Sequence, residues 1–131
     1  MKNLVLNTEE YAWLHHEVSR LWASQEKQAT EKPSIAKTPL FAVYRELAII
    51  FRNPIIQYEI RILSLNRKKL RLIEHLVNSQ VKVLTERVIP GYEEKIQRGE
   101  SPEFINPYLE RARTLLDKIL VKIQNKIGEL L

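Results

Sequence analysis

The chain has 131 residues, of which 44% are hydrophobic and 28% are charged, and its formal net charge is +5. This composition is typical of a globular domain and excludes a disordered or fibrous protein. The chain contains no cysteine, which excludes disulfides, thiolate nucleophiles and sulfur metal sites.

The length predicts one domain, 1–131, that is large enough to bury a core. No apolar run reaches the length of a membrane span. The start of the chain, 1–7, lacks the cationic segment, apolar core and cleavage site of a signal peptide. We therefore expect a cytoplasmic protein without a membrane partner.

The first predicted helix extends from Thr8 to about Gln25. Asn7 and Glu10 form a capping-box pattern at its start, and apolar residues follow at spacings of three and four. Trp13 lies off this apolar stripe. Two interpretations of Trp13 stay open, a partly exposed aromatic residue or a contact for a partner or a base.

Residues 24–38 are polar and predict a mobile loop that is longer than a usual helix connection. Its lysines are either solvated or phosphate contacts: Lys27, Lys32 and Lys37. Thr38 and Pro39 then begin a helix that runs to Phe51 or Arg52. Because this helix is apolar nearly all round, we expect it to be buried or to lie in a subunit interface.

The stretch from Pro54 to about Ile89 is predicted as one long helix. Asn53 and Pro54 form a helix-start signal, and Pro90 with Gly91 forms a stop signal. Apolar residues fill an arc of roughly 200°, about twice the stripe of an ordinary surface helix. This arc predicts an all-α fold, a helical bundle around one long central helix.

Two more helices are predicted after Pro90. A short one from Tyr92 to Arg98 is ended by Gly99, and the last one runs from Pro107 toward Leu131. The apolar residues of the last helix are close to heptad spacing, which predicts antiparallel packing on the long helix.

The positive charge is concentrated in 54–89, which holds seven Lys or Arg residues against three acidic ones. On the predicted helix they form a cationic strip, and two arginines of the preceding helix either extend it or simply solvate that side. Such a strip suits neutralisation of phosphates, although a solvated face that happens to be basic is an equal alternative. The candidate nucleic-acid-binding residues are Arg61, Arg67, Lys68, Arg71, Lys82, Arg45 and Arg52.

No pattern predicts catalysis, a metal or a cofactor, so we expect a protein that is not an enzyme. His15 and His16 are adjacent and point about 100° apart on a helix, which is not the one-turn spacing of zinc ligands. The three glycines form no phosphate-binding loop. Helical HEPN ribonucleases place four to six residues between an arginine and a histidine, whereas Arg71 and His75 have three between them.

A basic, cysteine-free, helical chain of this length without catalytic residues resembles the small helical subunit of CRISPR interference complexes. The resemblance rests on overall character and on no diagnostic motif. It implies a non-catalytic structural subunit that holds a DNA strand beside the guide RNA through Lys and Arg. It also implies contacts with other subunits and self-association of copies, for which Tyr44, Phe51 and the ends of the bundle are candidate contacts.

A second function from a different class stays open. The chain could be a phage or bacterial adaptor or inhibitor that binds a larger protein machine such as RNA polymerase. The apolar helix from Leu40 to Phe51 and the aromatic Trp13 favour this alternative.

Overall fold

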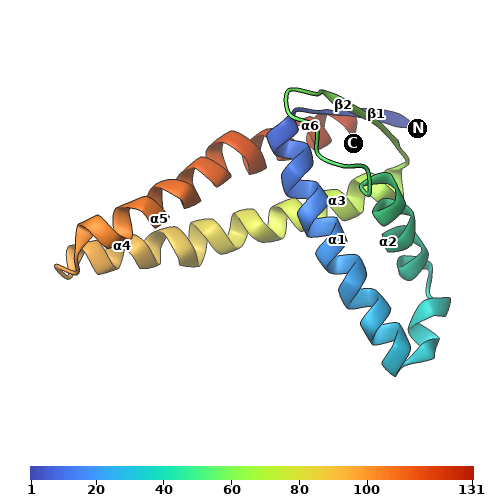
Figure 1. Ribbon diagram of the computed structural model, residues 1–131, viewed down its shortest axis with the longest axis horizontal. Coiled ribbons are helices and arrows are strands. Elements are labelled where there is room, and N and C mark those ends of the chain that lie inside the picture. The colour runs from blue at the N-terminus through green and yellow to red at the C-terminus, as the bar shows by residue number, and fades with distance from the viewer. The chain divides into compact units, whose positions relative to one another are not determined.

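The computed structural model describes all 131 residues and is mostly helical, with one small sheet (Figure 1). Contacts group the chain into two compact units, Met1–Arg71 with Leu130, and Leu72–Glu129 with Leu131. The elements are β1 (Lys2–Leu6), α1 (Thr8–Glu31), a 3₁₀ helix (Pro33–Lys37), α2 (Pro39–Ile50), β2 (Arg61–Leu65), α3 (Arg67–Val83), a π-helical turn (Leu84–Val88), α4 (Ile89–Gln97), α5 (Pro102–Thr114), a second π-helical stretch (Leu115–Leu120) and α6 (Val121–Leu130).

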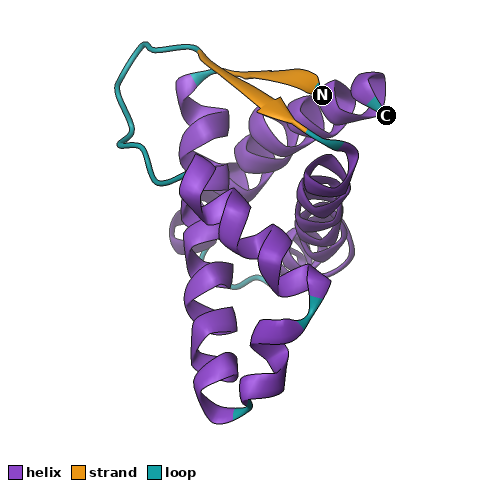
Figure 2. Ribbon diagram, turned by 90° about the vertical axis from the view of Figure 1, so that its right-hand side faces the viewer, coloured by secondary structure: helices purple, strands orange, loops and turns teal.

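The predicted all-α class is right for most of the chain, but the first unit also contains a two-stranded antiparallel sheet (Figure 2). In its register Leu4 lies opposite Leu63, and Val5 lies opposite Ile62. Burial alternates along both strands, with Leu4 fully buried and Val5 45% exposed. One face of the sheet therefore supplies core residues, as expected for a half-buried antiparallel pair.

The predicted helix from Pro54 to Ile89 is wrong in its first part. Residues 54–60 form an irregular connection, 61–65 belong to β2, and α3 begins only at Arg67. The side chain of Asn66 accepts a hydrogen bond of 2.9 Å from the Lys69 amide, so Asn66 provides the cap that we assigned to Asn53. The bundle around one central helix stays a prediction.

The predicted stop at Pro90 is also wrong, because the helical path continues to Gln97. A proline inside a helix lacks an amide donor and crowds the carbonyl four residues earlier. Here the π-helical turn Leu84–Val88 ends two residues before Pro90, and the Ile89 amide bonds to the carbonyl of Leu84, five residues earlier. The wider turn accommodates the proline ring without ending the helix.

Gly99 ends α4, as predicted. Its φ of +81° lies in the left-handed region that glycine adopts at low cost. The Gly99 amide donates to Ile96 at 3.1 Å, and the Glu100 amide donates to Lys95 at 3.2 Å. These two bonds are the Schellman pattern, which pairs the last carbonyls of the helix.

The predicted start of α1 is confirmed, and its predicted end is wrong. Asn7 and Glu10 form the capping box, with both hydrogen bonds at 2.9 Å. The helix runs on to Glu31, and a 3₁₀ helix follows from Pro33 to Lys37. Residues 24–38, which we predicted as a loop, are therefore largely helical.

The helix α2 forms where predicted, capped by the Thr38 hydroxyl. It packs against α1 through the rings of Trp22 and Phe41, which lie 4.9 Å apart. Phe51, directly after α2, adds a second aromatic pair with Tyr11 at 5.6 Å. The core of this unit consists mainly of Leu4, Leu6, Tyr11, Leu14, Val18, Leu47, Phe51 and Leu65.

The second unit contains an antiparallel helical hairpin, as predicted for the last helix. A hydrogen bond of 2.8 Å joins Asn78 to Gln124, and an ion pair of 3.6 Å joins Glu93 to Arg113. The last helical stretch begins at Pro102, not at the predicted Pro107, which lies inside α5. The core of the second unit includes Ile73, Val77, Leu84, Leu109, Leu120, Ile123 and Ile127.

The Asn66 cap can be tested by substitution. We expect Asn66→Ala to lower the free energy of unfolding by about 1 kcal/mol, because an orphan amide of α3 loses its acceptor. Urea denaturation measures the change. Asn125→Ala, at an exposed position inside α6, is the matched control and should cause no loss, since alanine is the better helix former. Equal effects of the two substitutions would contradict the assigned cap.

Candidate nucleic-acid interface

The first turns of α3 hold an unusual concentration of cations. Arg67, Lys68, Lys69 and Arg71 follow one another within five residues, and the first turn contains no acid. The N-terminal end of a helix carries a partial positive charge, so cations there are unfavourable by a few tenths of a kcal/mol each. Together with the helix N-terminus, these cations make the electrostatic potential at the start of α3 more positive. A positive potential favours binding of an anion.

Four of the predicted candidates lie on α3 and are exposed: Arg67, Lys68, Arg71 and Lys82. At 100° per residue, Arg67, Arg71 and Lys82 fall within an arc of about 60°, and Lys68 lies beside it. At a rise of about 1.5 Å per residue, the face extends over roughly 22 Å from Arg67 to Lys82. The exposed Asn78 and His75 share it.

Lys69 points to the other side of α3 and has a different role. Its side chain is only 11% exposed, and its ammonium lies 3.2 Å from the carboxylate of Glu46 on α2. The pair joins α2 to the first turn of α3. Sequence reasoning missed it because the two residues are far apart in the chain.

The prediction that Arg61 lies on a helix is wrong. It lies in β2, where its side chain is 15% exposed. Its guanidinium donates to the carbonyl of Pro54 at 2.6 Å, lies 3.6 Å from the carboxylate of Glu59, and covers the ring of Tyr11 at 4.8 Å from the centroid. These contacts give Arg61 a structural role.

The two remaining candidates do not share a helix. Arg45 is exposed on α2, whereas the exposed Arg52 lies in the turn after α2 ends at Ile50. The resemblance also implied that Tyr44 and Phe51 contact neighbouring subunits. Phe51 is fully buried, so it cannot contact a neighbour, and Tyr44 is half-buried.

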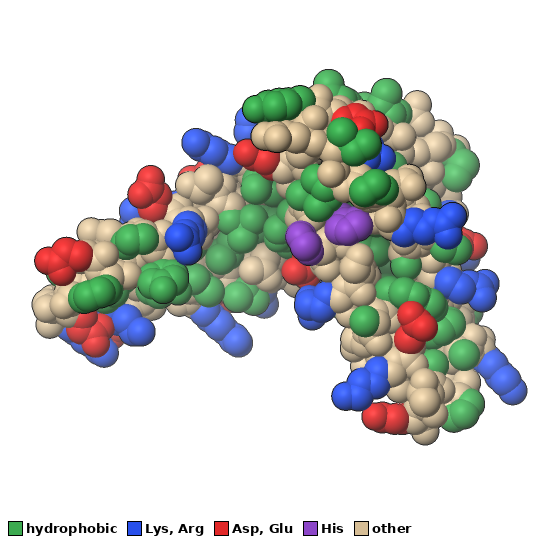
Figure 3. Space-filling view, viewed as in Figure 1, with side chains coloured by type: hydrophobic (Ala, Val, Ile, Leu, Met, Phe, Trp, Pro, Cys, Tyr) green, Lys and Arg blue, Asp and Glu red, His purple; other side chains and the backbone are tan.

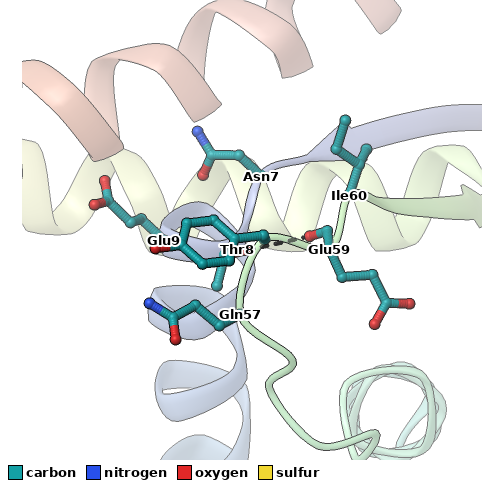
Figure 4. A pocket seen from close by; sticks show the side chains of 7 residues that line it. Asn7, Thr8, Glu9, Gln57, Glu59 and Ile60 are labelled. Atoms are coloured by element: carbon teal, nitrogen blue, oxygen red, sulfur yellow. Dashed lines mark hydrogen bonds between the residues drawn. The ribbon is translucent and has the colours of Figure 1, made fainter.

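The connection between α2 and β2 is fastened by side chains that bind its carbonyl groups. His15 of α1 bonds to the carbonyl of Phe51 at 2.5 Å, and the Tyr11 hydroxyl donates to that of Asn53 at 2.8 Å. Thr8 donates to the carbonyl of Glu59 at 3.2 Å, the dashed line in Figure 4. With the bond from Arg61 to Pro54, these contacts fix a segment that has no regular secondary structure.

Tyr11 contributes twice to these contacts, through its hydroxyl to Asn53 and through its ring to Arg61. Burial raises the pKa of its hydroxyl above the ordinary value of 10.0, while the positive charge of Arg61 lowers that pKa and the carboxylate of Glu59 raises it. The hydroxyl therefore stays protonated and continues to donate to Asn53 at pH values where an exposed tyrosine begins to ionise.

The surface includes an open pocket in each of the two units. One of about 380 Å³ lies between the start of α1 and residues 57–60, and another of about 420 Å³ lies along 107–119. In the first, the carboxylates of Glu9 and Glu59 point away from each other (Figure 4).

No group of three or more His, Asp or Glu residues is close enough to hold a metal ion. None of the helices combines the length and apolar character needed to cross a membrane.

The face shown in Figure 3 carries mixed charge. Figure 3 shows Lys and Arg side chains spread over the visible face with Asp and Glu side chains among them. Several are paired, including Arg20 with Glu17 at 2.8 Å and Arg98 with Glu94 at 2.5 Å. The first turn of α3 differs from this pattern, because it contains no acid.

Comparison with known proteins identifies no relative. No protein-family model matches the chain, and neither a curated protein nor a solved structure matches it.

Removing the Tyr11 hydroxyl tests the fastening of the connection. We expect Tyr11→Phe to lower the free energy of unfolding by about 1 kcal/mol near neutral pH, since the Asn53 carbonyl loses its donor. As the pH rises past about 10, Tyr11 of the unfolded chain ionises before that of the folded chain, and the wild type loses this advantage. The difference between the two proteins in urea denaturation should therefore shrink at high pH. A difference that does not change with pH would contradict the assignment.

Proposed function

We propose that this protein is a non-catalytic subunit that binds the phosphate backbone of a nucleic acid through α3. The observation that carries the proposal is the run of exposed cations at the start of that helix, Arg67, Lys68 and Arg71, with no acid in the first turn. Lys82 extends the contact along the same helix. Phosphate is the anion that both cationic side chains and helix N-termini bind well.

The expected contact depends on charge and shape more than on base sequence. Arginine and lysine bind phosphate oxygens, which fixes the position of a strand but reads no base. The helix holds its cations on a rigid support, so little reorganisation is needed when a strand binds. The spacing of about 22 Å between Arg67 and Lys82 allows contact with several successive phosphates.

The resemblance to small subunits of CRISPR interference complexes names one assembly in which such a protein would act. In that assembly the exposed cations of α3 would stabilise a DNA strand beside the guide RNA. Copies of the protein would contact one another and other subunits. If this assignment is correct, the protein copurifies with a ribonucleoprotein that contains a guide RNA. Copurification with a protein machine that lacks RNA would favour the second candidate.

The second candidate is an adaptor that binds a larger protein machine. Exposed apolar side chains favour it, notably Tyr58 at 90%, Phe104 at 74% and Ile60 at 66%. Leu40 and Ile49 of the apolar helix α2 are also more than half exposed. Aromatic and aliphatic side chains of this kind anchor many protein interfaces.

The salt dependence of binding tests the first candidate. We expect the affinity for DNA to fall steeply with ionic strength, because each neutralised phosphate releases counterions. Arg67→Gln and Lys68→Gln should each reduce the slope of log K against log salt by about 0.9 for duplex or 0.7 for single-stranded DNA. Fluorescence anisotropy with labelled oligonucleotides measures these slopes.

Lys122→Gln, which removes an exposed charge from α6, is the matched control and should leave the slope unchanged. A similar loss of slope for all three variants would indicate a general charge effect and would contradict a specific role of α3. No detectable DNA binding at low salt, alone and in the native assembly, would leave only the adaptor.

A further inference from the structure

The outer face of the two-stranded sheet is apolar and uncovered. Val5 and Ile62, which lie opposite each other in the register, are 45% and 65% exposed, and Ile60 just before β2 is 66% exposed. Asn3 and Ser64, the next pair on this face, are also exposed. The outer face of an antiparallel sheet is ordinarily polar, so this face has the character of a contact surface.

One end of this face meets the cations of the proposed phosphate contact. The strand β2 ends at Leu65, and Arg67 and Lys68 follow after the Asn66 cap. Lys2, which lies opposite Leu65, adds another exposed cation at the same end. A partner that covers the apolar face and also reaches this end therefore has to combine apolar surface with negative charge.

Tyr58 lies near the other end of the face, two residues before Ile60. It is 90% exposed, and its φ of +64° lies in the left-handed region, which is unusual for a bulky residue. The turn that carries Tyr58 is fixed, because the Thr8 hydroxyl donates to the carbonyl of Glu59 at 3.2 Å and the Glu59 amide donates to that of Ile56 at 3.3 Å. Backbone strain that surrounding contacts maintain is common at ligand-binding sites. The fold thus holds an aromatic ring in solvent on a rigid support.

The pocket of about 380 Å³ at this end offers groups that suit a nucleobase. Ile60 and the ring of Tyr58 supply apolar surface, and Gln57 and Glu9 supply an amide and a carboxylate (Figure 4). The faces of bases stack on aromatic rings, and side chains of these polar types hydrogen-bond to base edges. Because a base is uncharged, the carboxylate does not repel it, whereas a phosphate is favoured at the cationic end.

We propose that the outer face of the sheet binds the unpaired bases of a single-stranded nucleic acid whose phosphates are held at the start of α3. This inference rests on the proposed phosphate contact and adds the class of nucleic acid to it. Arg67 follows Ile60 by seven residues, a path of at most about 24 Å at 3.4 Å per residue, which is long enough for several nucleotides. The bases of a duplex are stacked and paired with each other, so a duplex cannot cover Val5, Ile62 or Tyr58 with its bases.

The affinities for a labelled oligo(dT) strand and for its duplex with oligo(dA) test the proposal, measured by fluorescence anisotropy at one salt concentration. The wild type should bind the single strand more tightly than the duplex. Tyr58→Asn, whose side chain tolerates the left-handed backbone, should weaken single-strand binding by about tenfold, because a stacked base loses its ring. The same variant should bind the duplex unchanged. Tyr58→Phe keeps the ring and should bind the single strand like the wild type.

Phe104→Asn is the matched control, because Phe104 is an aromatic residue of the other unit and is 74% exposed. It should leave single-strand binding unchanged. Photo-cross-linking provides a readout without substitutions: a strand that carries 5-iodouracil should cross-link to Tyr58 and not to Phe104, as identified by mass spectrometry.

Unchanged single-strand affinity of Tyr58→Asn, or an equal loss for Phe104→Asn, would overturn this inference. Single-strand affinity no higher than duplex affinity would overturn it as well. In each case a reduced salt slope for Arg67→Gln would still support the phosphate contact on α3, so the failure of this inference and that of the proposed function are distinguishable. No binding of either nucleic acid would overturn both.

Discussion

The pairing of β1 with β2 is the interaction on which the rest of the first unit depends. It joins Lys2–Leu6 to Arg61–Leu65, two segments more than fifty residues apart in sequence. Its inward face places Leu4, Leu6 and Leu65 in the core, each with no exposed surface. Because 61–65 is extended, helix α3 has to begin after it, at the Asn66 cap.

This position of the helix start divides the basic residues into two groups. Arg61 and Lys69 bind within the protein, to the Pro54 carbonyl and the Glu46 carboxylate respectively. Arg67 and Lys68 are exposed at the end of the helix where the backbone already favours anions. The positive charge that the sequence places on one stretch therefore serves both the fold and the proposed phosphate contact.

Local signals in the sequence predicted local structure correctly. The caps at Asn7 and Thr38 and the stop at Gly99 depend on a few neighbouring residues, and the structure confirms all three. The strand β2 was missed because Ile62, Leu63 and Leu65 fit an apolar helix face as well as a strand, and its partner is distant. Asn66 ahead of Arg67 was the signal that could have revealed the boundary.

The continuation of the helix through Pro90 was missed for a different reason. Proline is a reliable stop signal in a regular α-helix, but a π-helical turn changes the hydrogen-bond spacing, and nothing in 84–88 announces one. The four candidate site residues on α3 are exposed, as a polar helix face predicts. Arg61 is mostly buried instead, because its contacts depend on the fold around Tyr11.

The most direct test of this account is an NMR measurement of the backbone around Arg61–Leu65 in the full chain. Our account predicts cross-strand contacts between the backbone protons of Val5 and Ile62 and between those of Leu4 and Leu63, as their register requires. It also predicts that the sequential amide contacts of a helix begin only after Asn66. Helical amide contacts that run without a break through Arg61–Leu65 would contradict it.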